Sequence, residues 1–362
     1  MRRALELAER GWGRVSPNPL VGAVVVSTDG RVLGEGWHEG PGTAHAEVVA
    51  LAEAGRGAQG SILVTTLEPC NRFGRTPPCT KAVIDAGVGR VVVGATDPNL
   101  DGDAPGLAEL RDAGIQVETG ILEAEARRLN EAFERHVTTG RPLVVLKSGA
   151  SLDGRTAAGD GSSKWITSEQ ARADAQRLRA WSDAIVVGAG TVLADDPSLT
   201  VRDARWAQAR APIRVVVDAR GRVSIAAAVF DDDAPTLIAT TDRAPDAVVA
   251  GWVRAGADVA VVDADPAGGV SLANLLDALG KRDVQGLLVE GGPTLAWSFV
   301  RDGLVDRIVL YLAPKLLGGA SASGVLGGEG FAPVGAAIGL SFERVEPIGP
   351  DLKVEARVHR DH

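Results

Sequence analysis

Four residues between positions 45 and 79 have the types and the order that a hydrolytic metal site requires. His45 and Glu47 are separated by a single alanine, and Cys70 and Cys79 follow later in the chain. A catalytic zinc takes three protein ligands and keeps a fourth position open for water, whose pKa it lowers toward neutrality. An imidazole and two thiolates would supply the ligands, and the carboxylate of Glu47 would carry protons between water and the leaving group. The sequence therefore predicts a Zn²⁺ site made of His45, Cys70 and Cys79, with Glu47 as the catalytic residue.

These side chains must be placed by helix starts and by the end of a strand. Residues 61–68 are rich in β-forming types and predict a strand, so Cys70 would lie in the turn that follows it. Cys79 begins an apolar stretch that ends at a glycine, which is typical of a short helix. His45 and Glu47 precede the apolar positions of another helix. Because residues i and i+2 point apart in the middle of a helix, these two can reach one metal only from its first turn.

Other interpretations of these residues are weaker. Two cysteines in a long chain could be buried apolar side chains, and a lone histidine is usually a surface or core residue. A structural zinc site normally has a fourth Cys or His, which this stretch lacks. A disulfide is not favoured, because nothing else in the chain marks a secreted disulfide scaffold. The order H-x-E followed by P-C and a second C is typical of zinc-dependent nucleobase deaminases.

Length and composition indicate a two-domain globular protein. The chain has 362 residues, of which 45% are apolar and 23% are charged. Its formal net charge of −9 argues against non-specific attraction to nucleic acid or to a membrane surface. No apolar run is long enough to span a bilayer, and the first residues lack the apolar core of a signal peptide. We therefore expect a cytoplasmic protein that binds neither nucleic acid nor membrane.

The first part of the chain predicts an α/β domain. A short helix is expected over residues 4–10, and strands are expected at residues 21–26, 31–37, 61–68 and 90–94. Strands that alternate with helices predict a three-layer α/β sandwich with its site at the carboxyl ends of strands. The polar segment 138–142, which contains Gly and Pro, is the expected boundary. It divides the chain into domains 1–140 and 141–362.

The second domain also has an α/β pattern, with a mostly parallel sheet. Its expected strands are 143–146, 184–187, 213–218, 236–240, 258–262, 287–290 and 307–312, followed by β-rich stretches near 342–345 and 352–358. Thr167 and Gln170 predict a capping box before a helix that includes residues 171–179. This second pattern is complete enough to fold as a domain of its own.

Two glycine-bearing turns follow strands of this domain, at residues 188–191 and 290–294. Small residues there would let backbone amides approach a phosphate at the start of a helix. The first turn is not a dinucleotide-binding fingerprint, because position 193 is Leu where a third glycine is required. A structural turn explains each of them nearly as well. The residues alone therefore indicate a nucleotide- or phosphate-binding domain of unknown chemistry.

Longer motifs extend over nearly the whole chain. In the first half they are Ser16-Pro17-Asn18-Pro19-Leu20-Val21-Gly22 and Gly74-Arg75-Thr76-Pro77-Pro78-Cys79, together with the metal-ligand segments. In the second half they include Ser151-Leu152-Asp153-Gly154, Trp165-Ile166-Thr167, Leu199-Thr200-Val201-Arg202 and Glu290-Gly291-Gly292-Pro293-Thr294. With these motifs the chain resembles the bifunctional riboflavin-biosynthesis deaminase/reductase family. The resemblance implies a cytidine-deaminase-like three-layer sandwich followed by a dihydrofolate-reductase-like domain.

The resemblance also implies two consecutive reactions. The N-terminal domain would use zinc to deaminate a diamino-ribosylamino-pyrimidinone 5′-phosphate by hydrolysis. The C-terminal domain would use NADPH to reduce the ribosyl group to ribityl. The implied partners are these small phosphorylated pyrimidines and further copies of the chain, since members of this family commonly form homo-oligomers.

Residue roles follow from the same resemblance. The deaminase substrate would contact Asn18, Arg75 and Thr76. NADPH would contact Gly149, Trp165, Thr191, Asp195, Gly292, Pro293 and Thr294. The reductase substrate would contact Ser163, Leu199, Arg202 and Glu290, and the planar guanidinium of Arg202 matches phosphate oxygens. The chain departs from the family after Cys70, because Arg72 stands where the family usually has His, and we assign Arg72 no role.

Two alternatives stay open. The C-terminal domain could hold a ligand without reducing it, or the chain could be a deaminase of nucleic-acid bases. The acidic net charge, with no basic stripe interleaved with aromatic residues, weighs against nucleic acid.

Overall fold

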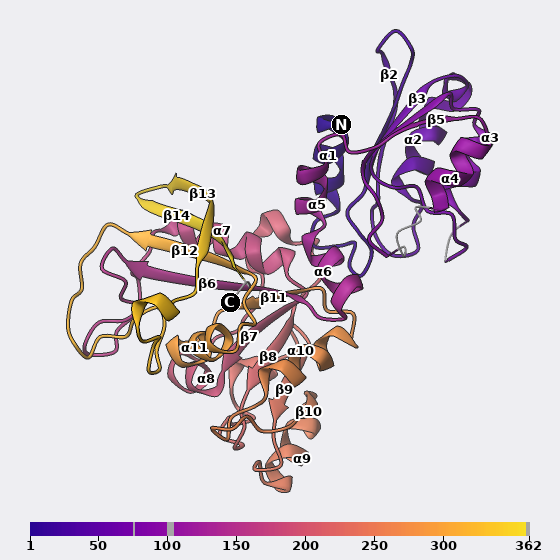
Figure 1. Cartoon of the computed structure of the whole chain (residues 1–362). Helices are drawn as coiled ribbons and strands as arrows, with labels where there is room; N and C mark the ends of the chain where they lie inside the picture. Colours follow the sequence, from indigo (N-terminus) through magenta and orange to yellow (C-terminus); the bar gives the residue numbers. More distant parts are fainter. Residues whose placement is uncertain (75–76, 100–104, 360–362) are drawn as a thin grey trace. The chain divides into compact units, whose positions relative to one another are not determined.

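The computed structural model describes residues 1–74, 77–99 and 105–359. The chain folds into two compact units, Met1–Gly140 and Arg141–His362, which the colours of Figure 1 separate into indigo to magenta and magenta to yellow. Each unit has its own sheet and its own hydrophobic core.

The first unit is built on a five-stranded sheet with the order β2-β1-β3-β4-β5. Its strands are β1 (Gly22–Val26), β2 (Val32–Trp37), β3 (Ile62–Leu67), β4 (Arg90–Ala95) and β5 (Gln116–Glu118). Strand β1 runs antiparallel to both of its neighbours, whereas β3, β4 and β5 are parallel. The carboxyl ends of β3 and β4 therefore meet at one edge of the sheet, and the turn that carries Cys70 leaves from this edge.

Helices cover both faces of this sheet. They are α1 (Arg2–Ala8), α2 (Ala46–Ala54), α3 (Cys79–Asp85), α4 (Pro105–Asp112), α5 (Glu123–Leu129) and α6 (Glu131–Thr139), with 3-10 turns at Glu9–Gly11 and Gly55–Ala58. Side chains alternate across a strand, so Ala23 and Val25 pack with α2, α3 and α4, whereas Val24 packs with α1. The three-layer sandwich predicted from the sequence is confirmed.

The second unit is built on a nine-stranded sheet with the order β10-β9-β8-β7-β11-β6-β12-β14-β13. Its strands are β6 (Leu143–Ser151), β7 (Ala184–Gly188), β8 (Ile213–Val217), β9 (Thr236–Thr240), β10 (Asp258–Val261), β11 (Gly286–Val289), β12 (Arg307–Ala313), β13 (Leu340–Ile348) and β14 (Asp351–Val358). The strands from β10 to β12 are parallel, whereas β14 and β13 add antiparallel pairs at one edge. The predicted mostly parallel sheet is confirmed.

The central strand β6 is longer than the sequence pattern indicates. Its first half, Leu143–Leu146, pairs with β11, as an apolar buried strand does. Its second half pairs with β12, from Val145 to Ser151, although this part is more polar. Gly149 therefore lies within the sheet, because the pairing with β12 continues the strand where the apolar run has ended.

Helix α7 (Glu169–Trp181) begins at a different cap from the one predicted. The N-cap residue is Ser168, whose hydroxyl accepts a hydrogen bond from the Ala171 amide at 3.2 Å. The predicted capping box of Thr167 and Gln170 is wrong, because the helix starts one residue later than that box requires. Thr167 and Ser168 are both common N-cap residue types. Only the path of the backbone decides which of the two caps the helix.

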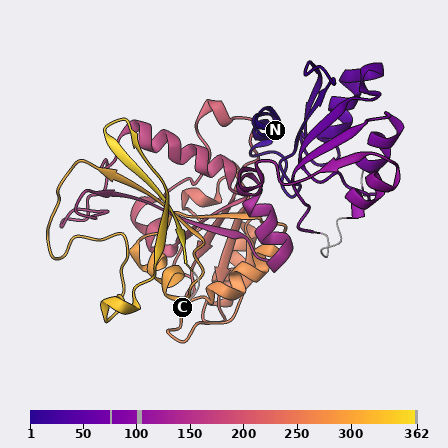
Figure 2. The same ribbon diagram turned by 45° about the horizontal axis from the view of Figure 1, so that its top comes forward.

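The remaining helices of this unit cover the two faces of its sheet. They are α8 (Ala189–Asp195), α9 (Asp246–Arg254), α10 (Leu272–Gly280) and α11 (Pro293–Arg301), with 3-10 turns at Ala204–Trp206, Ala228–Phe230 and Val334–Ala336. Helices α10 and α11 build the main core with alternate residues of β6 and β11, and α7 lies across the other face (Figures 1 and 2). None of the described helices is long and apolar enough to cross a membrane.

Candidate functional site

The predicted zinc ligands lie together at the carboxyl edge of the first sheet. His45 is the N-cap residue of α2, Cys79 is the first residue of α3, and Cys70 lies in the turn after β3. The His45 Nδ1 atom lies 3.0 Å from the Cys79 Sγ atom and 3.5 Å from the Cys70 Sγ atom, and all three ligand atoms lie within 4.8 Å of one another. Ligand atoms around a tetrahedral zinc are about 3.5 Å apart, given bonds of about 2.0 to 2.3 Å. The three side chains therefore fit a zinc ion.

Glu47 lies on the first turn of α2 and is 3% exposed beside this cluster. Burial raises the pKa of Glu47 to about 7, so its carboxyl group can both accept and donate a proton near neutral pH. The two cysteines titrate as a pair, because the hydrogen bond between them lowers the pKa of Cys70 and raises that of Cys79. The Cys79 amide also donates to the Cys70 Sγ atom at 3.4 Å, which favours a thiolate there.

A second histidine connects Asn18 to the metal cluster. The Asn18 Nδ2 atom lies 2.9 Å from the His38 Nε2 atom. The His38 ring stands edge-to-face against the His45 ring, with 5.5 Å between centroids. His38 is 4% exposed, and burial lowers its pKa, so the ring is held neutral. The predicted substrate residue Asn18 is thus brought to the site through a residue that the sequence interpretation missed.

The second unit assembles a charged cluster at the centre of its sheet. Glu290 directly follows β11, and its side chain is 7% exposed. Arg179 of α7 donates two hydrogen bonds to this carboxylate, both at 2.8 Å, and the Lys147 Nζ atom of β6 lies 3.6 Å away. Burial raises the pKa of Glu290, but the charges of Arg179 and Lys147 outweigh burial and lower it to about 2. The carboxylate therefore stays ionised at neutral pH.

Arg179 also joins Glu290 to the loop that carries two other predicted substrate residues. Its Nη1 atom donates to the carbonyl oxygen of Thr200 at 2.9 Å. Leu199, the preceding residue, is buried, whereas Arg202 is exposed. The Arg202 amide donates to the side chain of Gln176 on α7 at 2.7 Å. Helix α7 thus holds this loop beside Glu290.

The two glycine-bearing turns are neighbours at the carboxyl ends of β7 and β11. Gly188 is the N-cap residue of α8, and Gly292 is the N-cap residue of α11. The Gly292 amide donates to the Thr191 hydroxyl at 3.2 Å, which ties the turns together. Pro293, which has no N–H group, begins α11, and the amide of Thr294 in the same first turn has no partner within the helix. Adjacent turns of this kind fit the phosphates of a dinucleotide.

Trp165 presents an exposed ring, and Gly149 is a point of close packing in strand β6. Trp165 is 65% exposed, and the Arg172 guanidinium stacks on it at 4.4 Å from the ring centroid. Lys315 donates to the Trp165 carbonyl oxygen at 2.8 Å and so fixes this segment. A Cβ atom at Gly149 would meet the Thr167 side chain at 3.1 Å, so Thr167 packs closely against the strand backbone at this position. The exposed ring of Trp165 could stack on a planar ring, whereas the contact of Gly149 with NADPH stays a prediction.

Two predicted site residues of the second unit, among those that the structure describes, make none of these contacts. Ser163 and Asp195 are exposed, and neither takes part in the hydrogen bonds given above. Arg75 and Thr76 lie outside the described residues. Their roles stay predictions.

Three residues near these sites were missed by the sequence interpretation: His38, Lys147 and Arg179. Lys147 had a signal, because it is a lone cation at the end of the apolar run 143–146 in a central strand. His38 also had a signal, because it is a polar residue directly after the predicted strand 31–37. Arg179 had none, since arginines recur throughout its helix and only the fold selects one of them.

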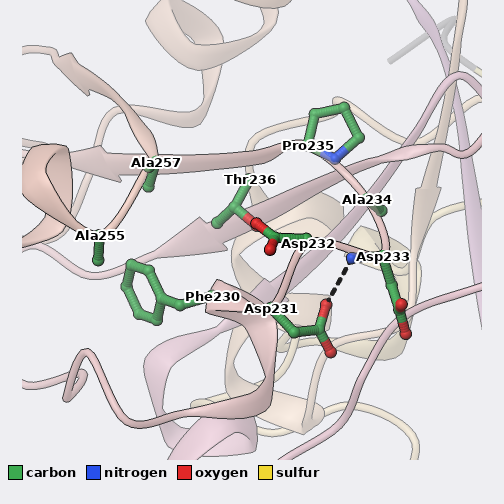
Figure 3. Close-up of a pocket in the computed structure, with 10 residues that line it drawn as sticks. Phe230, Asp231, Asp232, Asp233, Ala234, Pro235, Thr236, Ala255 and Ala257 are labelled. Carbon is green, nitrogen blue, oxygen red and sulfur yellow. Dashed lines mark hydrogen bonds between the residues drawn. The ribbon is translucent and has the colours of Figure 1, made fainter.

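A separate hollow of about 340 Å³ lies in the second unit, lined by Phe230 to Thr236 and by Ala255 to Ala257 (Figure 3). Thr236 begins β9, so this hollow lies at the amino end of a strand, whereas the glycine-bearing turns lie at carboxyl ends. Its Asp231 carboxylate is already engaged, by the buried Arg214 and by the Asp233 amide at 3.0 Å. Open α/β sheets bind ligands at the carboxyl ends of their strands, so we do not place the active site here.

Comparison with known proteins identifies both halves of the chain. Residues 142–354 match the RibD C-terminal domain, and residues 1–95 match the cytidine and deoxycytidylate deaminase zinc-binding region. The riboflavin biosynthesis protein RibD of Escherichia coli (strain K12) is 43% identical over 365 residues, covering 97% of this chain and 96% of that protein. The chain belongs to the RibD family. RibD of Aquifex aeolicus (strain VF5) is 41% identical and covers 98% of this chain and 96% of its own length.

Solved structures agree with this membership. Form 1 of Acinetobacter baumannii RibD has a TM-score of 0.88 and 37% identity, covering 99% of this chain and 98% of that chain. A deaminase/reductase of Thermotoga maritima has a TM-score of 0.86 and 36% identity, covering 99% and 97%. The family resemblance inferred from the motifs is confirmed. The chain is a bifunctional zinc deaminase and NADPH-dependent reductase of riboflavin biosynthesis.

Proposed function

We propose that the two activities are divided between domains 1–140 and 141–362 and act in sequence on phosphorylated pyrimidines. The first domain removes the 2-amino group of a diamino-ribosylamino-pyrimidinone 5′-phosphate, and the second reduces the ribosyl group of the product to ribityl. The observation that carries this proposal is the convergence of the His45, Cys70 and Cys79 ligand atoms beside a buried carboxyl group. The Thermotoga maritima relative is a diaminohydroxyphosphoribosylaminopyrimidine deaminase/5-amino-6-(5-phosphoribosylamino)uracil reductase, which supports the choice of substrates.

In the deaminase domain, Glu47 moves the protons. His45, Cys70 and Cys79 would hold the zinc ion, which would lower the pKa of a bound water molecule. Glu47 accepts a proton from the attacking water, passes it to the ring nitrogen, and delivers another to the leaving amine, so that ammonia departs and a carbonyl oxygen takes its place. Its pKa of about 7 allows both directions of transfer. Asn18, oriented by the neutral His38, faces the pyrimidine.

In the reductase domain, the charged cluster holds the ribosylamino group. NADPH, when bound, would supply the hydride. Glu290 stays ionised, so it accepts hydrogen bonds from sugar hydroxyls and donates no proton. Lys147, whose side chain is 20% exposed beside it, is the proton donor for the sugar oxygen released as the ring opens. Arg202 binds the phosphate group through its planar fork of donors.

The phosphorylated substrates, the net charge of −9 and the absence of a disulfide between Cys70 and Cys79 support a cytoplasmic enzyme that binds neither nucleic acid nor membrane. The cysteines need to stay reduced to bind a metal. Salt-dependent binding of single-stranded RNA would contradict this part of the proposal.

We also propose that the chain forms a homo-oligomer through strand β13. This strand lies at the edge of the second sheet, and its apolar residues Leu340, Phe342 and Val345 are 43%, 74% and 52% exposed. An exposed apolar edge strand invites pairing, and a second copy is the natural partner in a symmetric assembly. Light scattering on the wild-type protein and on Phe342→Lys tests this: a monomeric wild type would contradict it.

Two coupled assays test the proposed reactions. The zinc-loaded enzyme should release ammonia from the diamino substrate without NADPH, and should oxidise NADPH only when the deaminated product is present. If NADPH is not oxidised in the presence of the deaminated product at any enzyme concentration, the protein is a deaminase whose second domain only binds a ligand. Ammonia release from cytidine in RNA, but not from the pyrimidine phosphate, would favour a nucleic-acid deaminase.

A further inference from the structure

Helix α7 faces the reductase site on one flank and the antiparallel edge of the sheet on the other. Its apolar stripe of Ala171, Ala175 and Leu178 is buried. With 3.6 residues per turn, Asp174 lies on one side of this stripe and Arg179 on the other, about 140° apart around the helix axis. The two flanks of α7 therefore meet different strands. Because the helix is rigid, the contacts made by Asp174 determine the direction in which Arg179 points.

Asp174 is the centre of a buried polar cluster with β12 and β14. Its Oδ2 atom accepts hydrogen bonds from the Tyr311 hydroxyl and the Lys353 ammonium, both at 2.7 Å. Its Oδ1 atom accepts one from Arg177 at 2.7 Å. Tyr311 and Lys353 are 1% and 2% exposed, and Lys353 also lies 2.8 Å from Glu355. Buried charges persist only when they are paired in this way, so the cluster holds α7 in one position against the sheet.

The hairpin of β13 and β14 holds the start of the same helix. The Ser168 amide donates to the buried carboxylate of Asp351 at 2.7 Å. At the hairpin turn, a Cβ atom on Gly349 would meet the Gln170 side chain at 2.8 Å, so the two segments are in close contact. Figure 2 shows the yellow hairpin beside this helix. The N-terminus and the middle of α7 are thus both attached to β14.

The opposite flank of α7 supplies the contacts that order the site. Arg179 binds both oxygens of Glu290 and also the Thr200 carbonyl oxygen, and Gln176 binds the Arg202 amide. A bidentate pair depends on the direction of the planar guanidinium. A small rotation of α7 would therefore displace Glu290 and the loop of Arg202 together.

We propose that Asp174, held by Lys353 and Tyr311, is a positioning residue of the reductase site that sets the orientation of Arg179 toward Glu290. The inference rests on the reductase function proposed above. Asp174, Lys353 and Tyr311 are not among the residues assigned to substrate or cofactor, and they act only through the helix. Misplacement of a reacting group by about 1 Å can cost up to about 100-fold in rate, which sets the size of the expected effect.

Three single variants of the full-length, zinc-loaded protein test the proposal. Asp174→Asn should lower kcat/KM for the deaminated substrate about tenfold or more, with the KM for NADPH nearly unchanged and deamination unchanged. Tyr311→Phe keeps the packed ring and removes one hydrogen bond, so it should give a smaller loss in the same direction. The matched control is Asp231→Asn, which also removes a carboxylate from a buried arginine, Arg214, but touches no part of α7. It should leave reduction unchanged.

A double-mutant cycle separates positioning from general destabilisation. If Asp174 acts through Arg179, the double variant Asp174→Asn with Arg179→Lys should reduce substrate no more slowly than Arg179→Lys alone, because the oriented pair is already lost. If the loss of kcat/KM in the double variant equals the product of the losses in the two single variants, the proposal is overturned. Equal losses of kcat/KM in Asp174→Asn and Asp231→Asn would also overturn it. If Asp174→Asn does not fold, a wild-type rate of reduction in Tyr311→Phe would overturn it. Absence of reduction in the wild type would instead refute the proposed function itself.

Discussion

The two active sites contain buried glutamates with opposite proton affinities. Burial raises the pKa of Glu47 to about 7, because neighbouring groups do not offset the loss of solvent. Burial acts on Glu290 in the same direction, but Arg179 and Lys147 lower its pKa to about 2. One carboxyl group can therefore carry protons near neutral pH, whereas the other is an anion at this pH and is the one we propose to orient the reductase substrate. The same residue type serves two reactions because its neighbours differ.

The sites also differ in how far apart their residues lie in the chain. His45 and Cys79 are 34 positions apart, whereas Arg179 and Glu290 are 111 positions apart. A metal restricts its ligands to a few residue types, so the deaminase site leaves a compact motif. An ion-paired carboxylate uses residue types that occur on every protein surface, and only the fold brings them together.

Loss of the metal should give the largest difference between the deaminase and reductase activities. Cys79→Ser removes a zinc ligand at the start of α3, and we expect loss of bound zinc and of all measurable deamination, because the water is no longer activated. Reduction of the deaminated substrate should continue at the wild-type rate. Metal analysis by mass spectrometry, run beside both assays, checks this. Normal deamination by a zinc-free variant would contradict the site.

Glu47→Gln should give the next largest effect. The amide keeps the size of the side chain but cannot carry a proton, so deamination should fall about 10²- to 10⁴-fold. Zinc content and reduction should match the wild type, because Glu47 is not a ligand. Glu53→Gln, on the same helix, is the control and should behave as wild type. A wild-type rate of deamination in Glu47→Gln would show that Glu47 does not transfer the protons.

Arg202→Ala should have a smaller effect, confined to the second site. Loss of a charge-assisted contact to phosphate should raise the KM of the reductase substrate about tenfold or more, with little change in the KM for NADPH. Arg205→Ala, an exposed arginine three positions away, is the matched control. Equal increases in both KM values would show that Arg202 does not discriminate the substrate phosphate.

The acid stability of the protein should report the charge of Glu290. Its pKa lies below the ordinary value of 4.5, so it contributes stability that is present above about pH 4.5 and is lost as the pH falls toward about 2. Glu290→Gln should therefore show a shallower fall in unfolding free energy over this window, measured by urea denaturation at several pH values. Parallel curves for the two proteins would show that Glu290 is not ionised in the fold.

Much of the fold could be predicted from local patterns, and the errors share one cause. Strands such as 236–240 match the structure because apolar runs mark buried parallel strands. Strand β6 extends to Ser151, and Ser168 replaces Thr167 as the cap of α7, because pairing with β12 and contact with β14 decide these limits. Neither partner is close in sequence, so no local pattern could indicate them.

The sequence by itself determined the reaction class of the first domain, the α/β character of both halves and the family. The reason is that metal ligands and the strand–helix alternation are restricted to particular residue types and spacings. Only the tertiary structure decided that His38 adjoins Asn18, that Arg179 pairs with Glu290, and that Asp174 joins α7 to β14. Electrostatic interactions depend on distance in space and on burial, and both are set by how distant segments pack.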